Sequence, residues 1–409
     1  MICIAGKNDI SVEVLEYLYK KNNNRYELGV VCNQTDIGKN TWQRSLRFYA
    51  KQKNIKEYML EELYEIEDLI FLSLEYDRII KPAMFKTNKL YNVHFSLLPQ
   101  YKGVYTSAHP ILRGEKYVGV TLHKIDAGID TGDIIAQDRF KLKKTYTSRD
   151  LYLKYIRRGI QLTINNIDDI IRGNLVMYPQ TGNNASYYSK KTIDYTNLAI
   201  DLRQTSEDVI RQIRAFTFRE YQMPKVKERC IISGRITKIR SKEKYGMIVY
   251  ENECGMMLAT IDYNVFLYFD RFEELMQACE VGDLQKAALI CSVKEHINAI
   301  NEKGWSPIIM ATYNNHVELV KYLISVGADL YIKDNDGANL LMYAKDVYLK
   351  YGDPELFLLY QRLGLDVSLT DYYGNDIIDY IKKEKMEDDQ RTYLLENLDW
   401  SQKSKQNCV

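Results

Sequence analysis

The sequence predicts an α/β protein with three parts: an N-terminal doubly wound domain, a small hairpin-rich domain and an all-α C-terminal region. Three observations predict this order. Short apolar runs alternate with helical periods up to residue 175, short strands and hairpins dominate residues 183–262, and a repeat of 33 residues begins near residue 304. With 409 residues, the chain is long enough for two or three domains.

We expect the N-terminal domain to contain a parallel sheet with helices on both faces. Predicted strands at 2–6, 27–33, 68–74 and 90–96 are interleaved with predicted helices at 11–21 and 41–52. Four further elements follow, namely a helix at 106–114, strands at 118–125 and 133–142, and a long helix at 147–172. Ligands of such sheets bind at the carboxyl ends of the strands.

Changes in sequence texture set the expected domain boundaries. The turn-rich segment 174–186 predicts a linker, so the first domain spans 1–180. Residues 181–267 form the small α+β domain, with a helix at 206–216 and strands at 230–239 and 246–250. Helical repeats with polar end caps occupy 268–398, and 399–409 form a tail.

Composition and short patterns exclude several classes of function. The net charge is +1, so we expect neither nucleic acid nor a membrane surface as a partner. Seven cysteines without a CxxC pair, and no signal peptide, predict a reduced, cytoplasmic protein. No HExxH motif occurs, so we predict no metal site.

Two polar segments in the first domain carry the candidate chemistry. "NVHFSLLPQYKG", residues 92–103, places Asn92 and His94 at the end of a predicted strand. "DAGIDTGDII", residues 126–135, is a glycine-containing acidic loop with Asp130 at its tip. In a doubly wound sheet, both segments can reach the same crevice.

Together, these segments resemble the catalytic domain of the folate-dependent formyltransferases, which include methionyl-tRNA formyltransferase and the nucleotide-sugar N-formyltransferases. The resemblance covers residues 1–175 and implies a Rossmann-like domain with N10-formyltetrahydrofolate as the formyl donor. It implies that Asn92, His94 and Asp130 form the catalytic triad. It also implies a cofactor pocket, to which we assign Arg78, Ile79, Ile80, Met84, Ser96, Leu97, Leu98, Pro99 and Asp126.

The residue types suit these roles. When an amine attacks a formyl carbon, negative charge develops on the formyl oxygen, and one amide donor there is worth about 3 kcal/mol of barrier. We therefore expect Asn92 and His94 to donate to that oxygen, and His94 to accept the proton of the amine. Asp130 is expected to hold the tautomer of the His94 ring. A dead enzyme that only binds partners would be expected to lack one of the three.

The amine has two candidate carriers. A tRNA enzyme needs a basic surface, which this neutral chain lacks. Segment 211–226 and "GKND" instead resemble the sugar-nucleotide branch, which implies a dTDP-linked amino-dideoxy sugar, such as a 3-amino-3,6-dideoxyhexose, used for surface polysaccharide or O-antigen synthesis. Whether the amine is on C3 or C4 stays open. We assign substrate binding to Lys7, Asn8, Tyr101, Tyr105, Phe218 and Tyr221.

Residues 302–337 resemble an ankyrin repeat, and a longer repeat follows at 337–373. Such arrays usually bind proteins, so a protein partner is one expectation. Trp305 follows a turn where it should be exposed, and stacking on a nucleobase would offset that cost. We therefore hypothesise a second nucleotide site at Trp305, Tyr313, Asp334, Asn335 and Asp336, with packing or dimerisation as the remaining alternative. We also expect a homodimer through the small domain.

Overall fold

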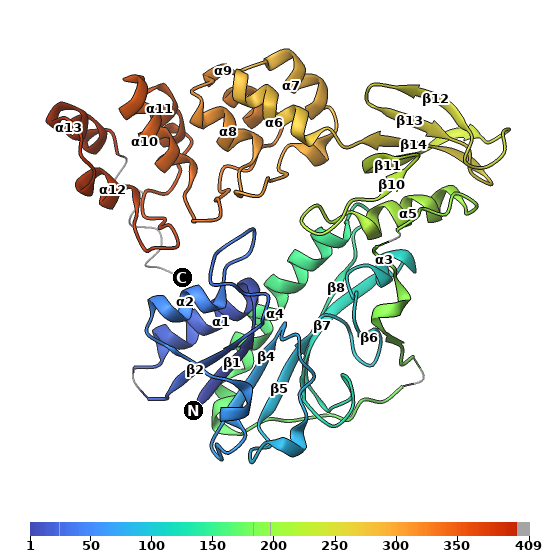
Figure 1. The fold of residues 1–409 in the computed structure, drawn as a ribbon, viewed down its shortest axis with the longest axis vertical. Coiled ribbons are helices and arrows are strands. Elements are labelled where there is room, and N and C mark those ends of the chain that lie inside the picture. The colour runs from blue at the N-terminus through green and yellow to red at the C-terminus, as the bar shows by residue number, and fades with distance from the viewer. Residues whose placement is uncertain (24, 183, 197, 399–409) are drawn as a thin grey trace. The chain divides into compact units, whose positions relative to one another are not determined.

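The computed structural model describes residues 1–23, 25–182, 184–196 and 198–398, and Figure 1 shows the chain path. The chain separates into two compact units, Met1–Phe269 and a second unit that begins at Asp270. The predicted tail at 399–409 lies outside the described residues. None of the described helices combines the length and the apolar character needed to cross a membrane.

The first unit contains a seven-stranded sheet with the order β3-β2-β1-β4-β5-β7-β8. The five strands from β3 to β5 pair in parallel. The strand β7 pairs antiparallel with both of its neighbours, β5 and β8. The expected parallel sheet is therefore wrong at this edge, because the loop 125–133 is too short for a crossover and joins β7 to β8 as a hairpin. The strands are β1 (Ile2–Gly6), β2 (Leu28–Cys32), β3 (Lys56–Glu57), β4 (Ile70–Leu74), β5 (Leu90–His94), β7 (Tyr117–Lys124) and β8 (Ile134–Lys141).

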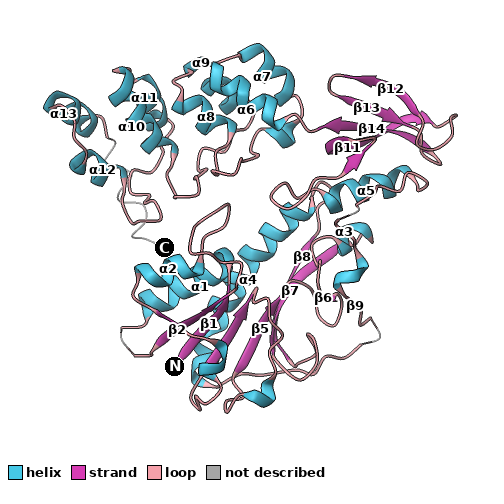
Figure 2. Cartoon of the chain, in the orientation of Figure 1, coloured by secondary structure: helices cyan, strands magenta, loops and turns pink. Residues whose placement is uncertain are grey.

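Helices α1 (Asn8–Lys21), α2 (Leu46–Gln52) and α4 (Ser148–Arg172) pack on one face of this sheet (Figure 2). The other face carries a smaller apolar cluster beneath two single-turn helices, Leu60–Leu63 and Pro82–Met84. Two helices are shorter than predicted. α2 begins only at Leu46 because Ser45 caps its first turn, and α3 (His109–Leu112) follows a left-handed Tyr105 with φ +59°.

A second sheet in the same unit has the order β10-β11-β14-β13-β12. The helix α5 (Ser206–Phe216) packs on it through a small core that includes Val209, Ile213 and Ile231. Its strands are β10 (Lys225–Val226), β11 (Arg229–Arg240), β12 (Ile248–Asn252), β13 (Gly255–Leu258) and β14 (Tyr263–Phe269). A two-stranded sheet joins β6 (Lys102–Gly103) to β9 (Tyr187–Tyr188), so residues directly after the predicted linker pair with the loop that follows β5.

The second unit is a stack of helix pairs. Asn301, Asp334 and Asp371 each accept two backbone N–H groups of the turn that follows them. These residues are separated by 33 and 37 positions, which agrees with one regular repeat followed by one longer by four residues. The helices are α6 (Phe272–Val281), α7 (Leu284–Cys291), α8 (Pro307–Tyr313), α9 (Val317–Ser325), α10 (Leu340–Tyr351), α11 (Glu355–Arg362), α12 (Ile377–Lys383) and α13 (Asp388–Glu396).

Candidate active site

Asn92 and His94 lie on the same face of β5, because side chains two residues apart in a strand point the same way. Across the sheet, Asn92 pairs with His123 and His94 pairs with Thr121 of β7. Asp130 reaches this face from the β7–β8 loop, with φ +53°. Gln180 holds that loop by donating from Nε2 to the carbonyl oxygens of Asp130 and Gly132 at 2.8 Å.

The structure brings the three predicted side chains together. Asp130 Oδ1 lies 3.5 Å from His94 Nδ1 and 3.4 Å from Asn92 Nδ2. Asp130 Oδ2 accepts the backbone N–H of Gly103 at 2.9 Å. The carboxylate is therefore anchored by one oxygen, and its other oxygen faces both the imidazole and the amide.

The tautomer of His94 is fixed by a backbone carbonyl. His94 Nε2 lies 2.7 Å from Tyr101 O, which can only accept, so Nε2 carries the hydrogen. In the neutral ring, Nδ1 therefore presents a lone pair to Asp130. The expectation that Asp130 sets this tautomer is wrong, because the Tyr101 carbonyl already determines it.

His123 is a neighbour of the site that the sequence reasoning missed. Its Nδ1 lies 2.8 Å from Lys124 O and must donate to it, which leaves Nε2 as an acceptor. Asn92 Nδ2 donates to this Nε2 at 3.0 Å. One Asn92 N–H is thus engaged with His123. The other N–H makes only the longer, 3.4 Å bond to Asp130, so it is the one that can turn toward a substrate oxygen. No sequence signal identified His123, because its role depends on the register that places it opposite Asn92.

Burial and charge set the protonation state of the pair. Burial lowers the pKa of His94 below 6.5, although the carboxylate of Asp130 opposes that shift. Burial alone would raise the pKa of Asp130, but His94, His123 and the Gly103 N–H hold it at about 2. Near neutral pH the site therefore holds an ionised carboxylate beside a neutral imidazole, and it is ready to accept one proton.

The loop 99–104 supports both catalytic candidates and is itself held by β9. The Tyr101 N–H donates to Ser186 Oγ at 2.8 Å, and the Lys102 N–H donates to Ser186 O at 2.8 Å. A Cβ on Gly103, which has φ +91°, would lie 2.2 Å from Tyr188 O. Only glycine allows this close pairing.

Tyr101 and Tyr105 were predicted to contact substrate. The Tyr101 ring is buried against Tyr188, with ring centroids 5.5 Å apart, and its hydroxyl donates to Glu115 at 2.6 Å. Tyr105 packs edge-on against Tyr195 at 4.9 Å. The structure thus uses the Tyr101 side chain in packing and its carbonyl at the site.

The predicted cofactor residues fall into exposed and buried groups. Ile79 and Met84 are exposed, at 72% and 52%, beside the buried Ile80. Ile80 shares its apolar cluster with Ile125, which directly precedes Asp126. This cluster brings the predicted cofactor residues around Ile80 close to the loop that carries Asp126. Arg78 forms an ion pair with Glu61, and the Asp126 carboxylate accepts hydrogen bonds from the Gly128 N–H and the Thr131 hydroxyl. In the segment 96–99, Ser96 and Leu98 are buried, whereas Leu97 and Pro99 are partly exposed.

The predicted substrate residues gather around groups that the sequence reasoning missed. Asn8 Nδ2 donates to Glu75 at 3.2 Å and to the Tyr152 hydroxyl at 2.8 Å. Phe218 is buried and Tyr221 is 57% exposed. Trp42 lies 5.6 Å from Phe218 and 5.8 Å from Tyr221 by ring centroids. Lys7 is the N-cap residue of α1, which has no side-chain cap among the described residues.

In the second unit, Trp305, Tyr313 and Tyr343 form an aromatic cluster. Trp305 lies 5.0 Å from Tyr313 and 5.6 Å from Tyr343, and it is partly buried, so the expectation of an exposed indole is wrong. The indole packs against the apolar core of the repeats. Tyr313 is 41% exposed.

The polar residues predicted beside Trp305 are engaged in the turns of the repeat. Asp334 accepts from Ala338 N at 2.8 Å and from the Tyr343 hydroxyl at 2.5 Å. Asn335 Nδ2 donates to Glu302 O at 2.7 Å, and Asp336 accepts from the Tyr373 hydroxyl at 3.0 Å.

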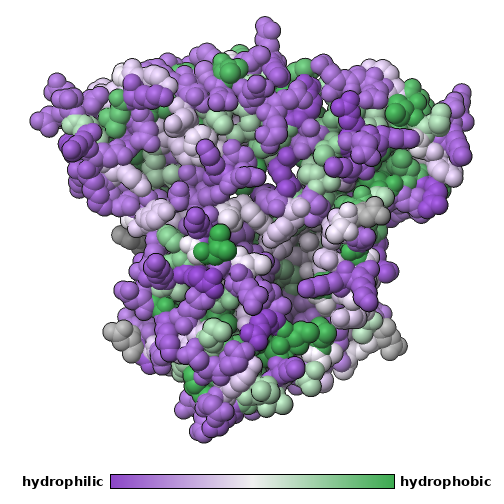
Figure 3. Space-filling model, in the orientation of Figure 1, coloured by the Kyte–Doolittle hydropathy of each residue, from purple (hydrophilic) through white to green (hydrophobic). Residues whose placement is uncertain are grey.

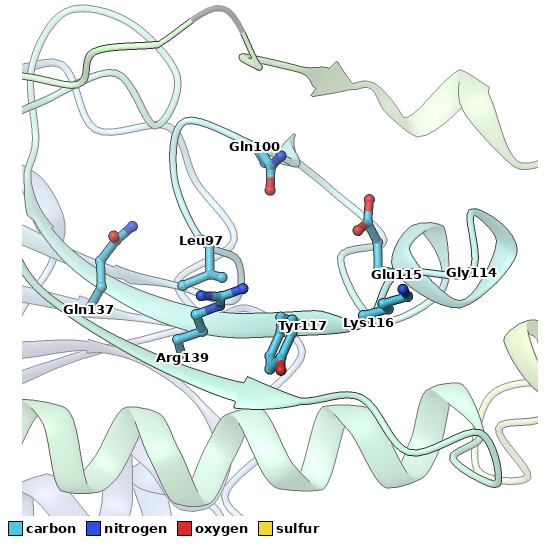
Figure 4. Close-up of a pocket in the computed structure, with 8 residues that line it drawn as sticks. All are labelled: Leu97, Gln100, Gly114, Glu115, Lys116, Tyr117, Gln137 and Arg139. Atoms are coloured by element: carbon cyan, nitrogen blue, oxygen red, sulfur yellow. The ribbon is translucent and has the colours of Figure 1, made fainter.

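A shallow cavity of about 620 Å³ lies beyond the loop that follows β5 (Figure 4). Leu97 and Gln100 line it from the loop, and Tyr117 and Arg139 line it from β7 and β8. The Arg139 guanidinium lies 4.0 Å from the centre of the Tyr117 ring. In the described part of the chain, no group of three His, Cys, Asp or Glu side chains is placed to bind a metal.

Comparisons with known proteins give two family matches. The formyl transferase profile matches residues 5–167, and the ankyrin repeat profile matches residues 275–368. The methionyl-tRNA formyltransferase of Kosmotoga olearia is 30% identical over 231 residues, which cover 53% of this chain and 72% of the relative. The methionyl-tRNA formyltransferase of Finegoldia magna is 28% identical over 281 residues, which cover 64% of this chain and 88% of the relative.

Two solved structures are more similar in sequence. The N-formyltransferase from Helicobacter canadensis, in complex with folinic acid and dTDP-3-aminofucose, is 42% identical with a TM-score of 0.61, and the match covers 66% of this chain and 99% of that one. The sugar 3N-formyltransferase WlaRD, solved with dTDP and 5-N-formyl-THF, is 41% identical with a TM-score of 0.61, and the match covers 66% of this chain and 97% of that one.

We predict that the His94 imidazole titrates below pH 6.5, because burial disfavours its charged form. Asp130→Asn should lower this pKa further, since the substitution removes the charge that opposes burial. The measurement is an NMR pH titration of histidine-labelled protein, with the signal assigned by His94→Asn. A wild-type pKa above 6.5, or an upward shift in Asp130→Asn, would contradict the assignment.

Proposed function

Because this chain belongs to the formyltransferase family, and is a folate-dependent enzyme that uses N10-formyltetrahydrofolate, we propose that it formylates the amine of a dTDP-linked amino-dideoxy sugar. The convergence of Asn92, His94 and Asp130 supports the chemistry. The sugar is supported by the 42% identity to the Helicobacter canadensis enzyme over 99% of that chain. A 3-amino-3,6-dideoxyhexose is the substrate we favour, with surface polysaccharide or O-antigen as its destination.

The residues around the predicted donor pocket fit a folate. Exposed Ile79 and Met84 beside buried Ile80 offer an apolar wall, as a flat pterin requires. Ile80 and Ile125 share one apolar cluster, which brings the β4–β5 connection next to the Asp126 loop. We assign the cofactor to these two segments and to residues 96–99. When bound, N10-formyltetrahydrofolate supplies the formyl group.

The protein's own groups manage one proton and one developing charge. The amine must release a proton as it forms the new C–N bond, and the donor nitrogen that leaves the formyl carbon must take up a proton in return. The carboxylate of Asp130 and the Nδ1 lone pair of His94 lie 3.5 Å apart and take that proton together, which leaves an imidazolium–carboxylate pair. The Asn92 N–H that makes the 3.4 Å bond to Asp130 is then free to stabilise negative charge on the formyl oxygen.

We place the nucleotide across the end of α1. The helix begins at Asn8 with Lys7 as its N-cap, and its dipole suits a diphosphate, although the Asp9 N–H already donates to Gln43 Oε1 at 3.2 Å. Phe218 and Tyr221, with Trp42 beside them, offer aromatic faces for the base.

A methionyl-tRNA formyltransferase is the second candidate, because the curated relatives reported above carry that activity in their names. The net charge of +1 favours the sugar, since tRNA binding rests mainly on cationic contacts to phosphates.

The edge strand β12 supports a homodimer. It pairs only with β13 among the described strands, and all five of its residues are exposed, including Ile248, Val249 and Tyr250. Figure 3 shows apolar side chains gathered over this hairpin. An apolar edge strand is a template for pairing with a second chain.

We propose that the ankyrin unit binds a second nucleotide at Trp305 and Tyr313. The Lys303 and Lys350 ammonium groups lie 5.4 and 5.7 Å from these two ring centres, respectively, so cationic groups flank the aromatic pair. A diphosphate attached to a stacked base would meet these charges. Docking of a protein partner on the repeats is the alternative.

Formyl transfer is tested with N10-formyltetrahydrofolate and a panel of dTDP-amino sugars, read by mass spectrometry. We expect a product heavier by one formyl group, and no formylation of methionyl-tRNA. Asp130→Asn should lower kcat by about 10²–10⁴-fold, because the carboxylate that stabilises the imidazolium formed on His94 is lost. Asp133→Asn in the same loop is the control, since Asp133 is exposed, and should stay within about 2-fold. Activity on tRNA alone would reverse the choice of substrate.

Calorimetry with dTDP tests the ankyrin proposal. We expect two sites per chain in the wild type and one in Trp305→Ala, because the stacking surface is removed. Tyr331→Ala removes another exposed aromatic of the same unit and should keep both sites. One site per chain in the wild type would exclude the proposal.

Light scattering tests the dimer. We expect a wild-type dimer at micromolar concentration, and at least a 10-fold weaker association in Val249→Asp, because a charge would enter the apolar edge. Val281→Asp, at an exposed position of the second unit, should leave the dimer intact. A monomeric wild type contradicts this interface.

A further inference from the structure

Glu75 directly follows β4, at the carboxyl edge where β1 and β5 also end. Leu74 pairs with Gly6 on one side and with Val93 on the other. Glu75 has φ +61°, and its carbonyl accepts from Asn33 Nδ2 at 2.9 Å, so its position is fixed. A non-glycine residue in this left-handed region is uncommon and often marks a functional site.

The Glu75 carboxyl group is held by one oxygen only. Oε2 accepts from the Tyr152 hydroxyl at 2.8 Å and from Asn8 Nδ2 at 3.2 Å. Within the described part of the chain, Oε1 has no hydrogen-bond partner and Glu75 forms no ion pair. Oε1 is also not among the fully enclosed, unpaired polar atoms, so it faces accessible space.

The tyrosine that donates to this carboxyl group belongs to a cluster of aromatic rings. Tyr152, which donates to Glu75, lies 5.8 Å from Trp42 and 5.5 Å from Phe218 by ring centroids. Phe218 in turn lies 4.7 Å from the exposed Tyr221. A polar acceptor set in an aromatic wall suits a ligand with both hydroxyl groups and apolar faces.

The position of Glu75 relative to His94 indicates which part of the ligand it meets. The strands β4 and β5 are neighbours, about 4.8 Å apart, and Glu75 and His94 each follow a paired residue, Leu74 and Val93. The reacting amine must lie at His94 and Asp130. Because Glu75 and His94 lie at the same edge of neighbouring strands, we take the part of the ligand near Glu75 to be the sugar ring, which the diphosphate separates from the base.

We propose that Glu75 determines sugar specificity: its Oε1 accepts a hydrogen bond from a hydroxyl group on a ring carbon next to the carbon that carries the amine. This inference rests on the proposed function and names the recognition element of its substrate. A site built to bind a hydroxyl rejects an analogue that lacks it, since a buried polar group is then left unpaired. Tyr152 and Asn8 act as positioning residues that orient the carboxylate.

The test compares a dTDP-3-amino-3,6-dideoxyhexose with its 2-deoxy and 4-deoxy counterparts, by kcat/KM and by calorimetric affinity without folate. In the wild type, removal of one of these hydroxyls should cost at least 30-fold. In Glu75→Ala that ratio should fall to about 3 or less, because the acceptor is gone. The affinity for dTDP alone should change less than 2-fold.

Two further variants separate recognition from a structural role. Burial raises the pKa of Glu75 to about 7, so the assays are run above that pH, where the carboxyl group is ionised. Glu75→Gln keeps the shape but cannot ionise, so the ratio should fall at least 3-fold. Tyr152→Phe keeps the free oxygen and should keep the ratio, with KM raised more than kcat is lowered. An unchanged ratio in both Glu75 variants overturns the proposal, as does a wild type indifferent to both deoxy sugars. The ratios of calorimetric affinities test hydroxyl recognition by Glu75 even if no formyl transfer is seen. The absence of formyl transfer would reject the proposed function separately.

Discussion

The hydrogen bond from His94 Nε2 to the Tyr101 carbonyl is the constraint on which the site depends. It directs the Nδ1 lone pair at Asp130, so the ring can take a proton on that side. The carbonyl is placed by a loop that turns back over β5, and the same loop donates the Gly103 N–H to Asp130. One short segment therefore positions both the imidazole and the carboxylate, and β9 holds that segment in place.

A cost follows from this arrangement. The unprotonated nitrogens of His94 and His123 lie 3.5 and 3.6 Å from Asp130 Oδ1. Three lone-pair atoms therefore face one another without a hydrogen between either nitrogen and that oxygen, which is repulsive. Such a cluster is stabilised by one added proton, and burial keeps that proton away from His94 in the resting state. In the proposed mechanism, the proton released by the amine relieves this repulsion, whereas burial makes His94 a weaker base.

The resemblance carried by two contiguous motifs at strand ends was sufficient to predict the three side chains that the structure brings together. It was not sufficient for the contacts that orient them. The Tyr101 carbonyl and the Ser186 partner act through backbone atoms, which carry no residue signature, and the role of His123 depends on its register opposite Asn92. The alternation of strands and helices that makes the parallel part of the sheet could be predicted, whereas the antiparallel edge depended on loop length.

The ankyrin unit shows how repeat architecture separates scaffold from candidate ligand contacts. Asn301, Asp334 and Asp371 accept equivalent turn N–H groups, so a polar acceptor at this position is a property of every turn. The residues that correspond to Trp305 are Ala338 and Asn375, because each donates its N–H to the acceptor of its own turn. The turn therefore does not require an indole. A ligand hypothesis for this unit must rest on the aromatic pair of Trp305 and Tyr313, since Asp334 is explained by the fold alone.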